Sequence, residues 1–426
     1  MTAEQKKRRI VYVNHTGKVS GAEKVLLHML RGLDRECYEP FVLCPAEGDL
    51  LRMAKAEGVS CSVVPELNAR FTTRPAQLIR YIVALFGIMS ALRREIRKSN
   101  PDFVHANTVR AGIAATIATI GTGRKIIWHV HDDLPRHPLS EIIRRLALAS
   151  HRTQVIAVSR ATAEAFRGSL KFGSRLQVIH NGTDLRRFPL KGYVESPLKL
   201  KKELSLPQDS FLVCAVGQIC ARKGLVELTQ AFSQVAQDSP KLHLAIVGET
   251  VFAHEKPYGE ALVRAVASAG LSDRVHFTGA RSDIAPVLQS ADLLVLNSLE
   301  EPFGLVLVEA MSCGTPVLAA RVGGIPEIVT DNVTGWLVER GATRELAAKL
   351  LLLSRQNNLL NRVAIAARET VCPRFSIEQF LTRLHSYYAE ISRSSPSYTS
   401  SYLSRERQQV TTPSLPAHHK EGDQFV

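Results

Sequence analysis

The clearest change between apolar and polar positions along the chain lies between residues 293 and 327. Leu293–Leu296 is an uninterrupted apolar run that predicts a buried strand, and the mostly polar residues 298–304 predict a loop. Leu305–Cys313 predicts a helix, and Pro316–Ala320 predicts a second buried strand. This strand–loop–helix–strand order is typical of a parallel sheet, and parallel sheets bind their ligands at the carboxyl ends of the strands.

The same alternation of short apolar runs and helical segments extends over most of the chain and predicts an α/β fold, with parallel sheets covered by helices on both faces. The other main strands that we expect are Ile10–Val13, Pro40–Cys44, Val59–Val64, Gln154–Ser159, Phe211–Gly217, Leu242–Gly248, Val275–Gly279 and Val333–Val338. The main helices that we expect are Lys24–Gly32, Leu50–Glu57, Pro75–Lys98, Ala111–Ile120, Glu141–Ser150, Tyr258–Ala269, Asp283–Ser290, Arg344–Glu369 and Ser376–Ile391. From Ser394 onward the chain is rich in Ser, Pro and Thr, which predicts a disordered tail. A chain of 426 residues is long enough for two domains.

The composition excludes several classes of protein. Hydrophobic residues make up 45% of the chain and charged residues 22%, as in ordinary globular proteins. Seven Cys without a Cys-x-x-Cys pair favour buried thiols in a reducing cytoplasm over a zinc site or a disulfide framework. The longest uncharged apolar run, Tyr81–Leu92, is too short to span a bilayer, and the amino-terminal apolar run is too short for a signal peptide. We therefore expect a cytoplasmic protein.

Positive charge is concentrated in the first part of the chain. Residues 1–185 hold 28 Lys and Arg against 16 Asp and Glu, a net charge of +12, whereas the whole chain has +14. No zinc-finger or RNA-recognition motif supports a nucleic-acid partner, and we expect none. The apolar stretch Leu78–Leu92, followed by four basic residues between Arg93 and Lys98, is typical of a helix on an anionic membrane surface. This favours a peripheral location on the inner face of the cell membrane, and a core helix with a solvated basic end is the alternative.

Two carboxylates bracket the loop and the helix that follow the strand at 293–296. Glu301 precedes the helix, and Glu309 lies within it, eight positions further on. Eight residues at helical rise span about 12 Å, whereas the two carboxyls of a glycosidase lie about 5–9.5 Å apart. The spacing better suits an elongated ligand with an anionic middle over the start of the helix, where Gly304 lets the backbone approach and free N–H groups favour an anion. A nucleotide-diphosphate sugar has this shape. An amphipathic helix with one solvated Glu would show the same spacing.

The stretch from Glu301 to Glu327 resembles the Glu-x7-Glu signature of the retaining family 4 glycosyltransferases. The resemblance includes Phe303-Gly304, the Cys-Gly-Thr-Pro turn and the Gly-Gly-Ile-Pro-Glu that follows. It implies the GT-B fold, in which two doubly wound Rossmann-like domains face each other across a cleft. The parts that it implies are an acceptor-side domain (1–185), a linker (186–207), a nucleotide-sugar-binding domain (208–375), a helix that crosses back to the first domain (376–392) and the disordered tail (393–426).

Cations for a leaving diphosphate are expected in the loop after Phe211–Gly217, where Arg222 and Lys223 stand. The corresponding loop of the family reads Gly-Arg…Lys-Gly, and both of its cations lie on the leaving diphosphate. Lys223 matches the Lys, but Gln218 replaces the first Arg, so a neutral amide stands where the family has a charge. Arg222 is the residue that could substitute for it.

The resemblance also assigns the remaining donor contacts. Glu301 would hold sugar hydroxyls and Glu309 the ribose. Phe303 and the backbone around Gly304 and Leu305 would lie beside the donor. Arg281 is in the loop that follows the Phe-x-Gly motif, and this makes it a candidate for contacts with the base.

Further matches lie in the first domain. The loop from Gly17 to Gly21 resembles the family's Gly-Gly-Ala-Glu loop between acceptor and donor phosphates, with Ser20 in place of one glycine. Phe103-Val-His-Ala-Asn resembles the family's Asp-x-Val-His strand end, which makes His105 a candidate for the acceptor pocket, although a lone His there is more often structural. His131 matches the His of the family's His-Asp strand end, which sits beside the sugar. His129 lies one step inside that strand and is expected to be structural. A metal site at this His pair would need further ligands, and we expect no metal.

The sequence therefore predicts a retaining, metal-independent glycosyltransferase of the hexosyltransferase type, with Glu301, His131 and Lys223 as catalytic groups. No cofactor is expected apart from the nucleotide-diphosphate sugar as co-substrate. The acceptor would be a glycan or a lipid-linked molecule in bacterial-type polysaccharide or glycolipid synthesis, such as lipopolysaccharide or exopolysaccharide. Two alternatives remain open: a non-hydrolysing sugar-nucleotide epimerase, and a degenerate nucleotide-sugar-binding protein, which the presence of Gln218 would explain.

Overall fold

The computed structural model describes residues 7–66, 75–135, 137–191 and 198–393. The internal contacts divide the chain into residues 1–382 and 383–426, with helix α15 (Ile377–Arg393) containing the boundary. Both sheets lie within residues 1–382. The predicted tail beyond residue 393 and residues 192–197 of the predicted linker lie outside the described residues. The predicted domain boundaries stay a prediction.

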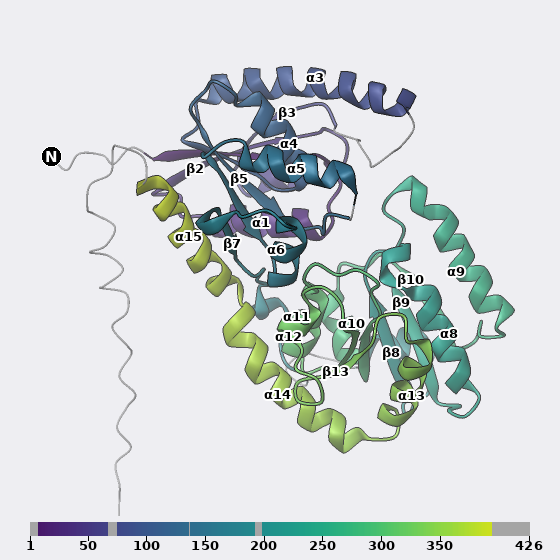
Figure 1. Ribbon diagram of the computed structural model, residues 1–426. Helices are drawn as coiled ribbons and strands as arrows, with labels where there is room; N and C mark the ends of the chain where they lie inside the picture. Colours follow the sequence, from purple (N-terminus) through teal and green to yellow (C-terminus); the bar gives the residue numbers. More distant parts are fainter. Residues whose placement is uncertain (1–6, 67–74, 136, 192–197, 394–426) are drawn as a thin grey trace, which may run out of the picture. The chain divides into compact units, whose positions relative to one another are not determined.

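The first sheet has seven parallel strands in the order β3-β2-β1-β4-β5-β6-β7 (Figure 1). Their bounds are β1 Arg8–Val13, β2 Tyr38–Cys44, β3 Ser60–Val63, β4 Phe103–Ala106, β5 Lys125–Val130, β6 Thr153–Ala157 and β7 Leu176–Val178. The chain winds outward from β1 to β3 and then returns to place β4 beside β1. Loops that leave β1 and β4 therefore turn to opposite faces of the sheet, and the gap at their carboxyl ends is where doubly wound sheets bind ligands.

The second sheet repeats this order with six parallel strands, β10-β9-β8-β11-β12-β13. Their bounds are β8 Phe211–Val216, β9 Leu242–Val247, β10 Val275–Gly279, β11 Leu293–Leu296, β12 Val317–Ala320 and β13 Trp336–Val338. The corresponding reversal lies between β8 and β11. The predicted α/β class with two doubly wound parallel sheets is confirmed.

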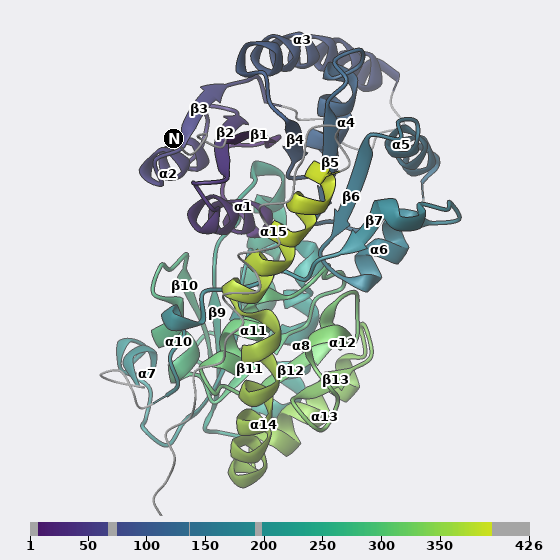
Figure 2. The same cartoon turned by 90° about the vertical axis from the view of Figure 1, so that its left-hand side faces the viewer.

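Strands of the second sheet are buried on both faces, as their continuous apolar sequences require. Along β8, Val213 packs into the core on one face, whereas the neighbouring side chains of Leu212 and Cys214 pack into the core on the other. Helices α8, α9 and α13 cover the first face, and α10 and α11 cover the second. Helix α11 also packs against α14 (Figures 1 and 2). This packing holds the start of α11 at the carboxyl edge of the sheet.

The helices within residues 1–382 agree with most of the predicted ones. Their bounds are α1 Gly21–Gly32, α2 Leu50–Ala56, α3 Pro75–Ser99, α4 Val109–Ala118, α5 Pro138–Leu148, α6 Arg160–Arg167, α7 Lys199–Glu203, α8 Leu225–Ala236, α9 Lys256–Ser268, α10 Ile284–Ser290, α11 Leu305–Ser312, α12 Ile325–Ile328, α13 Thr343–Leu353 and α14 Asn357–Phe375. None of the helices in the described part of the chain combines the length and the apolar character needed to cross a membrane.

Two features of the helices were not predicted. The single helix expected over Arg344–Glu369 is wrong, because the structure has two helices that are separated at residues 354–356. The hydroxyl of Ser354 donates to Leu351 O at 2.9 Å, a local bond that competes with continuing the helix. The pattern of apolar positions also did not predict α6, which follows β6 and starts at the carboxyl edge of the first sheet, or the short helices α7 and α12.

Candidate active site

Two loops of the second sheet are joined at the reversal between β8 and β11. The N–H of Leu299, after β11, donates to Arg222 O, after β8, at 2.7 Å. Gly224 has φ +60°, and a Cβ there would lie 2.2 Å from the carbonyl oxygen of Asn297, so only glycine fits this approach. The cations of one loop and the carboxylate of the other are therefore positioned by backbone contacts.

Lys223 and Glu301 form a buried ion pair between these loops. Lys223 Nζ lies 2.5 Å from Glu301 Oε2, and the two side chains are only 13% and 9% exposed. The hydroxyl of Ser298 donates to the same carboxylate oxygen at 3.1 Å. Burial by itself would raise the pKa of Glu301, but the charge and hydrogen bond of Lys223, the charge of Arg222 and the Ser298 hydroxyl together lower it. Glu301 is thus ionised and able to accept hydrogen bonds from hydroxyl groups.

Helix α11 starts directly after this pair. Gly304, the residue before the helix, has φ +103°, a conformation that favours glycine. Leu305 is the first residue of α11. The side chain of Phe303 is buried and packs against the rings of His180 and Phe375, with centroids 5.9 and 5.6 Å away. Any contact of Phe303 with a ligand would therefore come from its backbone.

Glu309 lies on α11 without a side-chain hydrogen bond or ion pair to any described residue. Burial raises the pKa of Glu309, and the charges of Lys24 and Arg187 act in the opposite direction. Two carboxylate oxygens are thus available at this position of the helix. This is the arrangement that a pair of ribose hydroxyls would require.

Gln218 and Arg222, in the same loop, have different surroundings. The Nε2 of Gln218 lies 2.6 and 2.5 Å from the two carboxylate oxygens of Glu255. The amide hydrogens of Gln218 are therefore taken up by a carboxylate, and the oxygen that remains cannot donate to a phosphate. The exposed Arg222 forms no ion pair with another described residue, and the charges of Glu301, Asp132 and Glu255 stabilise its cation.

Arg281, predicted to contact the base, is already engaged. Its guanidinium lies 2.7 Å from Glu203 Oε2 and 2.7 Å from Asp283 Oδ2. The hydrogen bonds to these two carboxylates raise the pKa of Arg281 and stabilise its charge. A contact with a base would have to be made beside these ion pairs, and the predicted role stays a prediction.

Three histidines lie together at the carboxyl ends of β4 and β5. A ring nitrogen of His105, Nε2, is 3.2 Å from His129 Nδ1, and the rings of His129 and His131 are 4.1 Å apart. Burial lowers the pKa of both His105 and His131 to about 3, and burial together with its two neighbours lowers the pKa of His129 well below its usual value. The imidazoles are therefore neutral.

Within this cluster, His131 is the ring that is closest to solvent, at 8% exposed, and its Nε2 has no hydrogen-bond partner among the described residues. His105 is fully buried against His129, so the structure lends no support to direct contact of His105 with an acceptor. His129 contacts both other rings. Its period-2 spacing from His131 predicts that these two share one strand face, but the contact with His105 depends on the pairing of β4 with β5.

The loop from Gly17 to Gly21 follows β1 and packs closely. A Cβ on Gly17 would lie 2.0 Å from Glu47 O, whereas a Cβ on Gly21 would meet nothing within 4 Å. Glu23 secures the loop: its carboxylate accepts hydrogen bonds from the N–H and hydroxyl of Ser20 at 3.0 and 2.6 Å. The prediction did not include Glu23, although it stands three residues after a Ser at a helix start, the spacing of a capping box.

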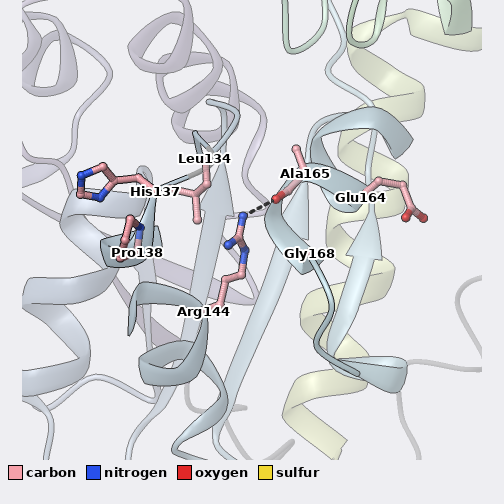
Figure 3. Close-up of a pocket in the computed structure, with 7 residues that line it drawn as sticks. All are labelled: Leu134, His137, Pro138, Arg144, Glu164, Ala165 and Gly168. Carbon is pink, nitrogen blue, oxygen red and sulfur yellow. Dashed lines mark hydrogen bonds between the residues drawn. The ribbon is translucent and has the colours of Figure 1, made fainter. Parts of the chain in front are cut away.

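A cavity of about 620 Å³ lies elsewhere in the first domain (Figure 3). Its lining residues are Leu134, His137, Pro138, Arg144, Glu164, Ala165 and Gly168. The guanidinium of Arg144 donates to Phe166 O and Ala165 O at 2.8 and 2.9 Å, so it closes the end of α6. None of the predicted site residues lines this cavity.

The described residues contain no group of three or more His, Cys, Asp or Glu side chains that could hold a metal ion. All seven Cys are free thiols.

Two family models match consecutive parts of the chain. The model for glycosyltransferase family 4 matches residues 19–187, which hold most of the first sheet, and the model for group 1 glycosyl transferases matches residues 198–370, which hold the second. The chain belongs to the group 1, family 4 glycosyltransferases. Its sheets and solved relatives show the GT-B fold, so the predicted family and fold are confirmed.

The relatives described next share moderate sequence identity with this glycosyltransferase. It is 27% identical over 314 residues to the N-acetyl-α-D-glucosaminyl L-malate synthase of Bacillus anthracis, covering 72% of this chain and 79% of that protein. It is 30% identical over 286 residues to the D-inositol 3-phosphate glycosyltransferase of Streptomyces scabiei, covering 62% of each. Among solved structures, Anabaena Alr3699/HepE in complex with UDP-glucose is 26% identical and has a TM-score of 0.77. The match covers 90% of this chain and 100% of that chain. The enzyme is thus a glycosyl-transferring transferase.

Proposed function

We propose that this glycosyltransferase takes its sugar from a nucleotide-diphosphate sugar bound at the amino end of α11, and that it transfers the sugar with retention of the anomeric configuration. The buried Lys223–Glu301 ion pair at the reversal between β8 and β11 is the observation that carries the proposal. A solved relative with 26% identity, HepE, binds UDP-glucose, which supports a donor of the same class here.

The charges of the site suit such a donor. The diphosphate would share the ammonium of Lys223 and the free guanidinium of Arg222, and free N–H groups at the start of α11 would add to this positive field. Sugar hydroxyls would donate to the ionised Glu301, and ribose hydroxyls to Glu309. A neutral His131 can donate or accept a hydrogen bond on the sugar side.

The donor and the stereochemistry can be tested together. A thermal-shift screen against nucleotide sugars should return one that raises the melting temperature, and NMR of the transferred sugar should show the anomeric configuration of the donor.

Addition of EDTA should leave the rate of sugar transfer unchanged, because the proposed cations replace a divalent metal. An inverted product would contradict the proposed retention. Binding of a nucleotide sugar without turnover would indicate a degenerate binding protein, and conversion of the donor without any acceptor would indicate an epimerase.

Helix α3 supports a peripheral membrane location and hence a lipid-linked acceptor. Ile79, Val83 and Phe86 are 62%, 66% and 63% exposed and recur at intervals of four and three residues, so they share one helix face. The opposite face is buried through Ile88, Leu92 and Ile96. The three exposed apolar side chains favour a surface helix over the alternative, a core helix with a solvated basic end. An exposed apolar face beside basic residues suits an anionic bilayer surface.

We expect the full-length enzyme to float with vesicles that contain anionic phospholipid and to bind neutral vesicles much less. Val83→Glu combined with Phe86→Glu should abolish flotation, because both charges would enter the bilayer interface. Ile365→Glu, which alters an equally exposed side chain on α14, is the matched control and should float like the wild type. Equal flotation of all three proteins, or equal binding to both kinds of vesicle, would refute a role of α3 in membrane binding.

A further inference from the structure

A carboxylate of the second domain binds the start of a helix in the first domain. Glu327, on α12, accepts hydrogen bonds from the backbone N–H groups of Arg160 and Ala161, each at 3.0 Å. These are the first two residues of α6, and their N–H groups have no partner within the helix. The third N–H, of Thr162, donates to the hydroxyl of Ser159 at 3.0 Å. The amino end of α6 is therefore completed by a side chain from the other domain.

The carboxylate of Glu327 is held in its charged form. His180 Nε2 lies 2.7 Å from Glu327 Oε2, and both side chains are largely buried. Burial would raise the pKa of Glu327, but the hydrogen bonds from His180 and the two amides lower it below its usual value. An ionised carboxylate bonded to amides in partial burial is a strong interaction, and leaving the amides unpaired would be costly.

The residues just before Glu327 contact the loop that carries Glu301. The N–H of Gly324 donates to Glu301 O at 3.0 Å. Gly323 has φ +50°, and a Cβ there would lie 2.0 Å from the same oxygen. The α12 segment thus contacts the loop of Glu301 through its backbone at one end, and it contacts α6 through the side chain of Glu327 at the other.

The same turn of α6 also reaches this loop and the histidine cluster's strand end. The hydroxyl of Thr162 lies 3.3 Å from Pro302 O, next to Glu301, and 2.9 Å from the carboxylate of Asp133, two residues after His131. A displacement of α6 would therefore be transmitted to both Glu301 and His131, which come from different domains.

We infer that Glu327 is a positioning residue: by binding the amino end of α6 it fixes the loop of Glu301 in the second domain relative to His131 in the first. Glu327 would contact neither donor nor acceptor. The inference depends on the proposed function only for its effect on turnover, because the link between α6 and the loop at 298–304 can be measured without any substrate.

Amide hydrogen exchange of the full-length enzyme tests the link. Glu327→Gln puts an NH2 group against a backbone N–H, so we expect the 160 and 161 amides to exchange at least tenfold faster. The coupling further predicts faster exchange over 298–304, with β8 and β9 unchanged. Thr108→Ala is the matched control: it removes the hydroxyl that caps α4 by accepting from the N–H of Ala111, leaves the Glu327 bonds, and should accelerate exchange near residue 111 alone.

His180→Phe provides a milder second variant. Phe preserves the ring contacts to Phe303 and Phe375 but cannot bond Glu327, so exchange should rise in both segments by less than in Glu327→Gln.

With the donor from the screen, Glu327→Gln should lower kcat at least tenfold, while the dissociation constant of the nucleotide diphosphate changes less than twofold. Faster exchange confined to α6 in both Glu327→Gln and His180→Phe would overturn the inference. So would a loss of nucleotide affinity as large as the loss of kcat. If the wild type shows no transfer at all, the proposed function fails, and the exchange result still decides the link.

Discussion

At the scale of single residues, the loop after β8 departs from the family pattern at Gln218. The family's Arg is Gln218 here, and the structure shows that its amide is bound to Glu255. Sequence comparison reveals the substitution but not the partner, because Glu255 is 37 positions away and reaches Gln218 only through the fold. The structure thus shows that Gln218 bonds a carboxylate and is not directed at a phosphate. Arg222 is the cation of the loop that forms no ion pair with a described residue.

Gln218→Arg should restore the missing charge. We expect the new guanidinium to pair with Glu255 and to bind the diphosphate of the donor as well, which should strengthen nucleotide-diphosphate binding roughly tenfold, since a charge-assisted hydrogen bond contributes about 1.5–3 kcal/mol. Calorimetric titration would measure the change. A variant that binds no more tightly than the wild type would show that the site has no room for a cation at 218.

At the scale of elements, the short segment between β12 and α12 contacts the loop of Glu301, because the N–H of Gly324 donates to Glu301 O. The strand–loop–helix–strand order of residues 293–320 was predictable, because buried parallel strands have continuous apolar sequences. The contact between Gly323 and Glu301 was not, since no local pattern records which loops of two strands will touch. For the same reason the sequence offered no role for Glu327, whose partners lie more than 140 residues away.

Gly323→Ala should displace the loop of Glu301, for which we propose a role in sugar binding. Its positive φ costs an Ala about 1–2 kcal/mol, and the clash with Glu301 O adds to this cost. Gly341→Ala is the matched control, because Gly341 also has positive φ, at +73°, but nothing lies within 4 Å of its Cβ. Urea unfolding should show a larger loss of unfolding free energy for Gly323→Ala than for Gly341→Ala. The rate of sugar transfer should fall in Gly323→Ala and stay at the wild-type value in Gly341→Ala. Equal effects on stability and rate would contradict the role assigned to this contact.

At the scale of the whole molecule, the two sheets follow the GT-B order, and their reversals place most of the predicted site residues at carboxyl strand ends. The division into two Rossmann-like sheets was predictable from the alternation of strands and helices. The burial of the histidine cluster was not, because a His in an apolar strand can face either the core or a ligand. Three neutral imidazoles in one core have a consequence for the stability of the fold.

Stability should fall as the pH is lowered from 6.5 to 5. The pKa of His105 is about 3 in the folded chain, against 6.5 when unfolded. In that window the unfolded chain binds more protons, so unfolding is favoured by acid and the contribution is fully present only above pH 6.5. The raised pKa values of Glu23 and Glu309 act in the opposite direction. Comparing urea unfolding of the wild type and His105→Gln isolates the histidine: the variant should show a flatter pH dependence, and identical slopes would contradict the neutral, buried assignment.

The most direct test of the donor site is calorimetry on Glu301→Gln and Lys223→Ala, using the nucleotide sugar from the screen and its free nucleoside diphosphate. Lys223 is paired with Glu301 in the structure, so removing the charge of Glu301 releases the ammonium for phosphate. We expect Glu301→Gln to bind the free diphosphate at least as tightly as the wild type but to lose the extra affinity for the sugar, whereas Lys223→Ala should bind both about 10- to 100-fold more weakly. If Glu301→Gln weakened both ligands equally, or if Lys223→Ala bound them like the wild type, the ion pair would not be the donor site.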